Sequence, residues 1–283
     1  MMPARWSLAK VFDFAGQRVA FEHWGEGPPV VMVHGTPFSS YVWRNIAREI
    51  ARVHQVFVFD LLGYGQSEMH EGQDVSLGIQ NKLLAALLRH WRLDHPAVIC
   101  HDFGAVTALR AHLIDGCEYA KMLMFDAVAI RPWGSPFVQH VRHNEAAFTG
   151  VPDYLHRAIL RAYIRGSVHR LMSDEELEPY LAPWLGTVGQ PAFYRQIAQM
   201  DERFTDEVEG LYGGVRCPVR LLWGAKDEWI PVERGRRLAA MIPGCSLIEI
   251  PHAGHLMQED APEAIVSAAL RFFDRRGQAD GSS

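Results

Sequence analysis

The 283-residue sequence predicts an α/β fold in which a mostly parallel, eight-stranded sheet is flanked by helices and interrupted by an inserted helical cap. Two observations predict this fold. Short apolar runs alternate with segments of helical periodicity in residues 1–126 and again after residue 216, the pattern of a parallel sheet. Between them, residues 127–215 lose the apolar runs and become helical and aromatic. With 48% hydrophobic residues, the chain can bury one large core.

The first part of the chain predicts a hairpin followed by the start of the parallel sheet. Ser7–Phe14 and Arg18–Trp24 flank Gly16, as two strands flank a turn. Pro29–His34 is a continuous apolar run, which is typical of a strand buried on both faces. The next helix and strand are expected over Ser39–Val53 and Gln55–Asp60.

A glycine-rich turn, Leu61–Ser67, follows and could suggest a phosphate-binding loop. No Gly-Lys-Ser or Gly-Lys-Thr comes after it, so a tight loop is the better interpretation. The remaining core elements are expected as helices at Val75–Trp91 and Ala105–Ile114, and as strands at Pro96–Cys100, at Lys121–Phe125, from about Pro218, and at Ser246–Ile250.

The change of pattern predicts the division of the chain. We expect residues 1–126 and 216–275 to form the core, residues 127–215 the cap, and residues 276–283 a disordered tail. Each aromatic residue of the cap, taken singly, is expected to pack against the core. Together they predict an apolar pocket, because small ligands are often enclosed between two such parts of a protein.

Asp102 lies where a buried strand turns directly into a helix. Its neighbours Cys100 and Gly104 are small, as the tight and strained turn beneath an exposed nucleophile requires. Aspartate is also one of the best residues for capping the first turn of a helix. From the local sequence alone, Asp102 could be either a nucleophile or a helix cap.

Two later segments favour the nucleophile. Asp227 ends the strand that begins near Pro218, and His255 follows the strand after it. Nucleophile, acid and histidine therefore occur in the chain order described for the α/β-hydrolase fold. Asp126 ends the strand before the cap and is an alternative acid, although Asp227 stands in the stronger motif.

His34–Ile46, His101–Gly104 and His252–His255 resemble the haloalkane dehalogenase and epoxide hydrolase branch of the α/β-hydrolase superfamily. The resemblance covers nearly the whole chain and is loosest in the cap. It implies that Asp102 attacks an electrophilic carbon to form an alkyl-enzyme ester, which a water activated by His255 then hydrolyses. It further implies that Asp227 orients this histidine.

A carboxylate suits this chemistry because it is already a nucleophile at neutral pH and needs no base for the attack. Hydrolysis of the resulting ester needs hydrogen-bond donors for the oxyanion. The backbone N–H groups of Thr36 and Phe103 are the expected donors.

The residues beside the nucleophile distinguish haloalkane dehalogenases from epoxide hydrolases. Haloalkane dehalogenases typically hold the departing halide with an asparagine at the position of Thr36 and a tryptophan at that of Phe103, and neither donor is present here. Trp184 in the cap is a candidate replacement donor. Trp184 and Trp133 are also expected to line the substrate pocket.

Epoxide hydrolases instead protonate the ring oxygen with two tyrosines of the cap. Tyr194 resembles the second of them, and either Tyr154 or Tyr163 could be the first. Epoxide opening to a vicinal diol is therefore the favoured expectation, and carbon–halogen hydrolysis is the alternative. A small-ligand receptor, or an enzyme of non-hydrolytic rearrangement, is the alternative of another class.

The composition of the chain indicates which kinds of molecule it can bind. A net charge of −5 gives no electrostatic reason to bind nucleic acid or an anionic membrane. Four cysteines, at positions 100, 117, 217 and 245, lack metal-ligand spacing and are expected as reduced thiols. We expect no cofactor and no metal, but a small apolar or amphipathic electrophile that reacts with water. Met1–Trp6 lacks an apolar run, so the expected location is cytoplasmic.

Overall fold

The computed structural model describes residues 6–274, and within them eight strands form one sheet in the order β1-β2-β4-β3-β5-β6-β7-β8. The strands are β1 (Lys10–Phe14), β2 (Gln17–Trp24), β3 (Pro29–Val33), β4 (Gln55–Phe59), β5 (Ala97–His101), β6 (Lys121–Phe125), β7 (Val219–Gly224) and β8 (Ser246–Ile250). Strand β2 runs antiparallel to both of its neighbours, and all later pairs are parallel. These observations confirm the predicted fold class.

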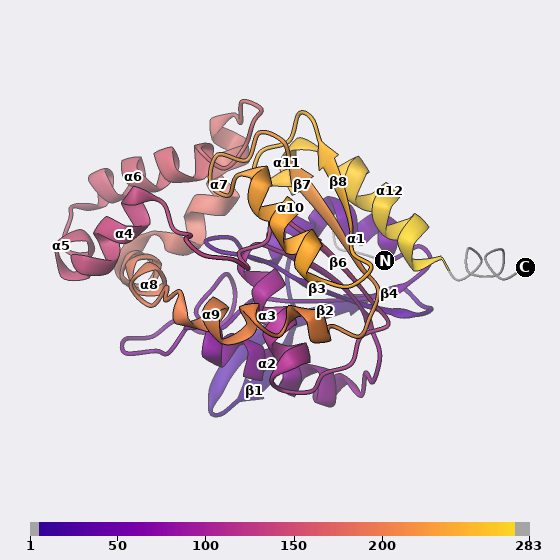
Figure 1. Ribbon diagram of the computed structural model, residues 1–283. Coiled ribbons are helices and arrows are strands. Elements are labelled where there is room, and N and C mark those ends of the chain that lie inside the picture. The colour runs from indigo at the N-terminus through magenta and orange to yellow at the C-terminus, as the bar shows by residue number, and fades with distance from the viewer. Residues whose placement is uncertain (1–5, 275–283) are drawn as a thin grey trace, which may run out of the picture.

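Helices cover both faces of the sheet. Helices α1 and α12 pack together, as do α2 and α3, and the two pairs lie on opposite sides of the sheet (Figure 1). Strand β5 lies in the middle of the sheet and is buried along its whole length. The helices outside the cap are η1 (Ser40–Trp43), α1 (Arg44–Ile50), α2 (Leu77–Trp91), α3 (Phe103–Leu113), α10 (Val232–Met241), α11 (Met257–Asp260) and α12 (Pro262–Phe273).

Residues 127–215, which we call the cap, contain helices and no strand, and the structure describes all of them. Helices α4 to α8 gather at one end of the molecule (Figure 1). Side chains start two of them: Ser135 caps α4, and Ser173 forms a capping box with Glu176 at α7. The cap helices are α4 (Pro136–His143), α5 (Glu145–Thr149), α6 (Asp153–Arg165), α7 (Asp174–Leu181), η2 (Ala182–Trp184), α8 (Gly186–Ala198), α9 (Arg203–Glu209) and η3 (Tyr212–Gly214).

Some boundaries differ from the prediction. The helix expected over Ser39–Val53 begins as a 3-10 turn and is α-helical only over Arg44–Ile50. Strand β5 extends one residue further than expected, and α3 begins at Phe103 instead of Ala105. A single residue, Asp102, is left between them, so the turn is tighter than the sequence indicated. The tail predicted at residues 276–283 lies outside the described residues.

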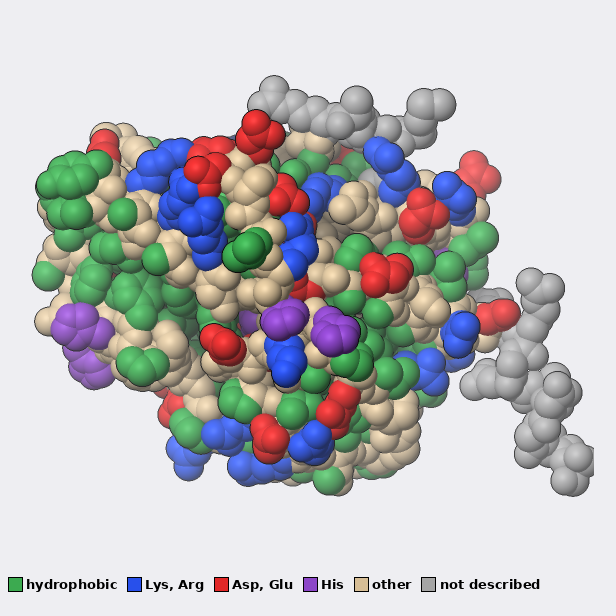
Figure 2. Space-filling view, turned by 90° about the horizontal axis from the view of Figure 1, so that it is seen from above, with side chains coloured by type: hydrophobic (Ala, Val, Ile, Leu, Met, Phe, Trp, Pro, Cys, Tyr) green, Lys and Arg blue, Asp and Glu red, His purple; other side chains and the backbone are tan. Residues whose placement is uncertain are grey.

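The surface mixes the two signs of charge. On the face that Figure 2 shows, acidic and basic side chains are interspersed, and hydrophobic side chains gather toward the cap end. Among residues 6–274, no helix combines the length and apolar character needed to cross a bilayer. All four cysteines are unpaired, and Cys100 and Cys217 are buried.

Candidate active site

Asp102 occupies the strained turn between β5 and α3. Its φ of 52° lies in a region that residues other than glycine rarely adopt. The backbone is tied to the end of β6 and to the segment after it, because the Asp102 N–H donates to the Phe125 carbonyl at 3.3 Å and its carbonyl accepts from Val128 N at 3.3 Å. The Asp102 side chain makes no capping hydrogen bond to α3, so the helix-cap alternative is wrong.

Two glycines let the chain close around this turn. A Cβ atom on Gly35 would lie 2.4 Å from Asp102 Cβ. A Cβ atom on Gly104 would lie 2.2 Å from the carbonyl oxygen of Val33, at the end of β3. Both distances are shorter than side chains tolerate, so the loop after β3 and the first turn of α3 need glycine to meet at the carboxylate.

The loop after β3 supplies a donor to the carboxylate. The Thr36 N–H donates to Asp102 Oδ1 at 2.7 Å. The Phe103 N–H belongs to the first residue of α3, where amides have no partner inside the helix. Both expected oxyanion donors therefore stand beside Asp102, one in contact with the carboxylate and the other next to it in the chain.

His255 connects the two predicted carboxylates. Its Nδ1 lies 2.9 Å from Asp227 Oδ2, and its Nε2 lies 3.4 Å from Asp102 Oδ2, which is longer than a normal hydrogen bond. Asp227 Oδ1 accepts the N–H groups of Trp229 and Ile230, each at 2.8 Å. Asp227 is thus fixed by the loop after β7, and it orients the imidazole.

The electrostatic surroundings favour a protonated His255. Burial alone would lower its pKa, but the charges of Asp227 and Asp102, together with the hydrogen bond to Asp227, outweigh burial and raise the pKa well above its usual value. Because one of these two carboxylates is Asp102, any reaction that neutralises Asp102 removes part of this stabilisation.

Asp126 does not take the place of Asp227. Its side chain is fully buried, Oδ1 accepts the Gly224 N–H at 2.8 Å, and Oδ2 has no hydrogen-bond partner. Burial and the neighbouring charge of Asp227 raise its pKa well above the usual range for a carboxyl group. Of the two candidate acids, only Asp227 is bonded to His255 among the contacts of the described residues.

The loop that carries His255 is bonded to the cap segment 167–170. Leu256 N donates to the Ser167 carbonyl at 2.7 Å. Asp260 Oδ2 accepts from Gly254 N at 2.7 Å and from His169 N at 2.8 Å, so one carboxylate joins the two segments. The position of His255 is therefore tied to the position of the cap.

A buried carboxylate on α11 strengthens the same junction. Glu259 Oε1 accepts from Arg44 Nη1 at 2.6 Å and from the Tyr180 hydroxyl at 2.5 Å, and Oε2 accepts from Arg170 Nη2 at 3.0 Å. Arg44 belongs to the core, whereas Tyr180 and Arg170 belong to the cap. We call these four residues the Glu259 clamp.

A cavity of about 40 Å³ opens onto Asp102. Six of its lining residues are among those predicted from the sequence: Thr36, Asp102, Phe103, Trp133, Tyr163 and His255. Seven others were not predicted as site residues: Val128, Gly134, Ser135, Val138, Met200, Trp229 and Ile230. Trp229 is the most informative of these, since it packs against His255 at 4.9 Å between ring centroids and stacks on Tyr163 at 4.5 Å.

Only one of the three candidate tyrosines reaches this cavity. Tyr163 lines it, but Tyr154 is 72% exposed. The two are nine residues apart on α6, a separation that places them on opposite faces of a helix. The hydroxyl of Tyr194 lies 2.9 Å from His156 Nδ1, away from the lining residues. The expectations for Tyr154 and Tyr194 are therefore not met.

The two predicted tryptophans differ as well. Trp133 lines the cavity, and its indole N–H donates to Thr205 Oγ1 at 3.0 Å. Trp184 does not line it, because its indole N–H donates to the Pro37 carbonyl at 2.7 Å within a buried aromatic cluster. Neither indole N–H is free to replace a missing halide donor, and the expectation for Trp184 is wrong.

A polar network behind Thr36 was also not predicted. The Thr36 hydroxyl donates to Gln196 Oε1 at 2.6 Å, and the Tyr64 hydroxyl donates to the same oxygen at 3.2 Å. Gln196 Nε2 is buried and has no partner. The Thr36 side chain thus points its hydrogen toward the cap helix α8, and a single glutamine in a helix gave no signal of this in the sequence.

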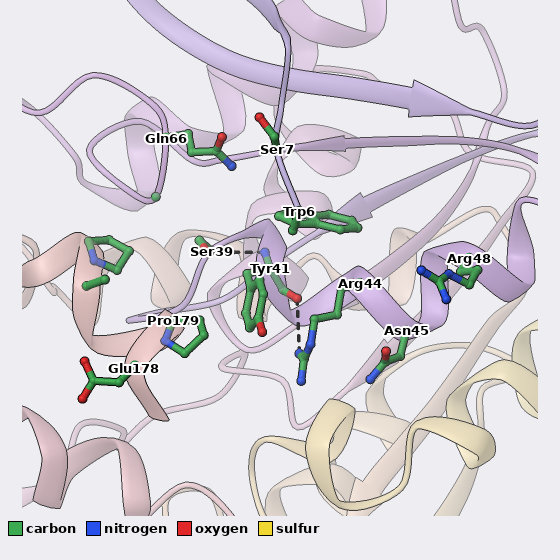
Figure 3. Close-up of a pocket in the computed structure, with 13 residues that line it drawn as sticks. Trp6, Ser7, Ser39, Tyr41, Arg44, Asn45, Arg48, Gln66, Glu178 and Pro179 are labelled. Atoms are coloured by element: carbon green, nitrogen blue, oxygen red, sulfur yellow. Dashed lines mark hydrogen bonds between the residues drawn. The ribbon is translucent and has the colours of Figure 1, made fainter. Parts of the chain in front are cut away.

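A much larger hollow, of about 900 Å³, lies at the surface between the first described residues, α1 and the cap (Figure 3). Trp6, Tyr41, Arg44 and Glu178 are among its lining residues. None of the predicted site residues lines it, and Arg44 is committed to the Glu259 clamp. The predicted catalytic residues therefore face the small cavity and not this hollow.

The chain is similar to known hydrolases. A family model described as "Alpha/beta hydrolase family" matches residues 30–268. An alpha/beta hydrolase fold protein from Burkholderia ambifaria is 54% identical with a TM-score of 0.92, covering 94% of this chain and 98% of that one. Haloalkane dehalogenase 2 of Mycobacterium tuberculosis (strain ATCC 25618 / H37Rv) is 26% identical over 279 residues, 93% of each chain.

A thermophilic esterase from Thermogutta terrifontis is 23% identical with a TM-score of 0.74, covering 93% of this chain and 95% of that one. At this level of identity the likeness shows a shared fold alone.

Proposed function

The chain belongs to the alpha/beta hydrolase family, and we propose that this hydrolase acts through a covalent alkyl ester on Asp102. One observation carries the proposal. The Asp102 carboxylate stands on the strained elbow with Thr36 N at 2.7 Å from one oxygen and His255 Nε2 at 3.4 Å from the other. A nucleophile, a base and an oxyanion donor thus converge on one small cavity.

The first step needs no base. An oxygen of Asp102 attacks the electrophilic carbon, a carbon–oxygen bond to the enzyme forms, and the bond to the leaving group breaks. The electron pair of that bond goes to the leaving group, which is an alkoxide when an epoxide opens. A proton donor in the cavity then stabilises this charge.

The second step uses the change of charge that the first step produces. Ester formation removes the negative charge of Asp102, so the pKa of His255 falls and its neutral form becomes available. His255 takes a proton from water, and the oxygen of that water attacks Cγ of Asp102. The N–H groups of Thr36 and Phe103 stabilise the oxyanion, and Asp227 stabilises the imidazolium. When the oxyanion collapses, the bond between Cγ and the oxygen attached to the substrate breaks, and that oxygen takes the proton from His255 as the alcohol leaves.

Epoxides are the first candidate substrates, and the product is a vicinal diol. The reason is Tyr163, which lines the cavity and whose hydroxyl makes no hydrogen bond to the protein within the described residues. Burial and the charge of Asp102 both raise the pKa of this phenol, so it keeps its proton until an alkoxide forms. One tyrosine then donates to the ring oxygen, where the epoxide hydrolases that the sequence resembles use two.

Carbon–halogen hydrolysis is the second candidate. It is favoured by the relatives named haloalkane dehalogenase, which match 93% of the chain. The halide donors speak against it, because the Thr36 hydroxyl and the Trp133 indole are bonded elsewhere and Phe103 offers no side-chain N–H. Loss of one donor to developing charge costs about 3 kcal/mol.

Intact-mass spectrometry on His255→Gln tests the proposal. After exposure to a panel of epoxides and bromoalkanes, we expect an adduct on Asp102, because attack remains possible while hydrolysis of the ester stalls. The double variant Asp102→Asn with His255→Gln should stay unmodified. His252→Gln, at an exposed histidine of the same loop, is the control that keeps turnover.

The compounds that form an adduct with His255→Gln identify the substrate class. Adducts from epoxides support the first candidate, and adducts from bromoalkanes alone support the second. A folded His255→Gln protein that gives no adduct with either class contradicts the ester mechanism and favours a receptor or a rearrangement enzyme on this fold.

A further inference from the structure

The cavity beside Asp102 is small. Its volume is about 40 Å³, whereas a pocket for a drug-sized ligand usually measures about 300–1,000 Å³. The cavity therefore suits a compact ligand and not a drug-sized one.

Its walls are buried side chains that are held in place. Val138 and Met200 are each only 3% exposed and close it from the cap. Trp133 meets the edge of Phe103 at 5.4 Å between centroids, and the Trp133 indole is fixed by its hydrogen bond to Thr205. Well-packed walls of this kind do not make room for a longer chain without cost.

The stack of two aromatic rings closes another side. Tyr163 and Trp229 lie nearly parallel, with 4.5 Å between centroids and 20° between planes, and Trp229 also packs on His255. Tyr163 comes from the cap and Trp229 from the loop that contains Asp227. Movement of these two rings would disturb the orientation of His255, so they cannot open independently to admit a larger ligand.

The lining contains no lysine and no arginine. Asp102 and His255 are its only ionisable groups apart from the Tyr163 phenol. A substrate that carries a carboxylate would meet the charge of Asp102 with no dedicated counter-charge, in a site shielded from water. An uncharged substrate avoids this repulsion.

We infer that the active site selects compact, uncharged electrophiles and excludes longer chains; this inference rests on the proposed function for the identity of the reacting carbon. Within the epoxides, 1,2-epoxypropane, with four non-hydrogen atoms, is the compact test substrate. 1,2-Epoxyhexane, with seven, is the long one.

A binding experiment tests the size limit without any reaction. The full-length protein is titrated with ethanol, 1-propanol, 1-pentanol and 1-hexanol, and binding is read from the NMR signals of the tryptophan indoles, which include Trp133 and Trp229. In an open apolar site each added methylene strengthens binding about fourfold. Here we expect affinity to peak at 1-propanol and to be at least tenfold weaker for 1-hexanol.

Variants of the wall give the matched comparison. Val138→Ala and Met200→Ala should strengthen the binding of 1-hexanol at least tenfold, because they remove wall atoms. Val141→Ala, on the same helix, and Met172→Ala, elsewhere in the cap, remove the same atoms at buried positions outside the lining and should leave the order unchanged.

A reactive arm separates this inference from the proposed function. His255→Gln should form its Asp102 adduct at least tenfold faster with 1,2-epoxypropane than with 1,2-epoxyhexane. If the longer epoxide and the longer alcohol are preferred, the size limit is overturned while the ester mechanism stands. If no adduct forms but 1-propanol remains the best alcohol, the ester mechanism is overturned and the size limit stands.

Discussion

At the scale of single residues, Asp102 and Asp227 carry the same carboxylate in opposite settings. Asp227 accepts two backbone N–H groups and His255, so all its capacity serves to hold the base. Asp102 accepts one backbone N–H and faces the cavity. In the proposed mechanism the same side chain is therefore an orienting group in one place and the nucleophile in the other.

The choice between the two acids can be measured. Asp227→Asn should lower turnover about a thousandfold or more, because the neutral amide does not stabilise the imidazolium. Asp126→Asn should keep activity within about tenfold, since Asp126 bonds to Gly224 and not to His255. Steady-state kinetics with the best substrate of the panel decides it, and the reverse order of the two variants would overturn the assignment.

His255 also links stability to pH. Its pKa is raised in the folded protein, so the stability it contributes is present below its ordinary pKa and is lost as the pH rises through the raised value. The free energy of unfolding of the native protein should therefore fall across this window. In His255→Gln the dependence should be flatter, which denaturant titrations at several pH values would show. Equal slopes in both proteins would contradict it.

Residue identity was predictable where a motif surrounds it. Asp102, Asp227 and His255 follow strand ends in an ordered series, and the structure brings all three together. The cap tyrosines lack such a frame, because their use depends on which face of α6 or α8 turns inward. Tyr154 and Tyr163 were equivalent candidates in the sequence. The structure distinguishes them because the face of α6 that carries Tyr163 is turned toward the cavity and the face that carries Tyr154 is turned to solvent.

At the scale of elements, the site depends on how closely β3, β5 and α3 approach one another. Gly35 and Gly104 permit this approach, and each would place a Cβ atom against its neighbour. The sequence marked Gly104 through the elbow pattern. It did not reveal why a glycine is needed at position 35, because that requirement arises from a contact with Asp102, 67 residues later in the chain.

Substitution of this glycine should disable the site. Gly35→Ala places a methyl group where Asp102 now lies, so we expect turnover to fall at least a hundredfold because the carboxylate is displaced. Gly210→Ala is the control, since nothing lies within 4 Å of its added Cβ. Kinetics and thermal unfolding of both variants check this, and a fully active Gly35→Ala enzyme would contradict the packing argument.

Elements with a distinct apolar pattern were predicted closely, as β4 and β6 show. Helices α10 and α12, residues 232–241 and 262–273, were not predicted, because they are amphipathic segments without a functional motif. The start of α1 was misjudged because Ser40–Trp43 adopts a 3-10 turn. Val42 and Trp43 of this turn are buried in the core, and the local sequence does not show the contacts they make there.

At the scale of the whole molecule, the end of the strand–helix rhythm after β6 revealed the cap. The walls of the cavity could not be predicted in the same way. They come from the loops after β3, β5, β6 and β7, from the start of α3, from two cap helices and the segment between α8 and α9, and from the loop of His255. Their meeting is a property of the folded chain and has no local signature.

The Glu259 clamp should contribute to the stability of the joined core and cap. Glu259→Gln should lower the free energy of unfolding by about 1–3 kcal/mol, less than for a fully buried pair because both guanidinium groups reach solvent. Glu178→Gln breaks an exposed pair with Arg157 and should cost about 1 kcal/mol or less. Denaturant titration compares them, and equal losses would contradict the role of the clamp.

The hydrogen bonds of Asp260 connect the position of the cap to the proposed reaction. Its carboxylate accepts the N–H groups of Gly254 and His169, so the histidine loop and the cap segment are held to each other. In the proposed mechanism, a displacement of the cap at this edge would also displace His255 from Asp102. Activation of water would then require a docked cap.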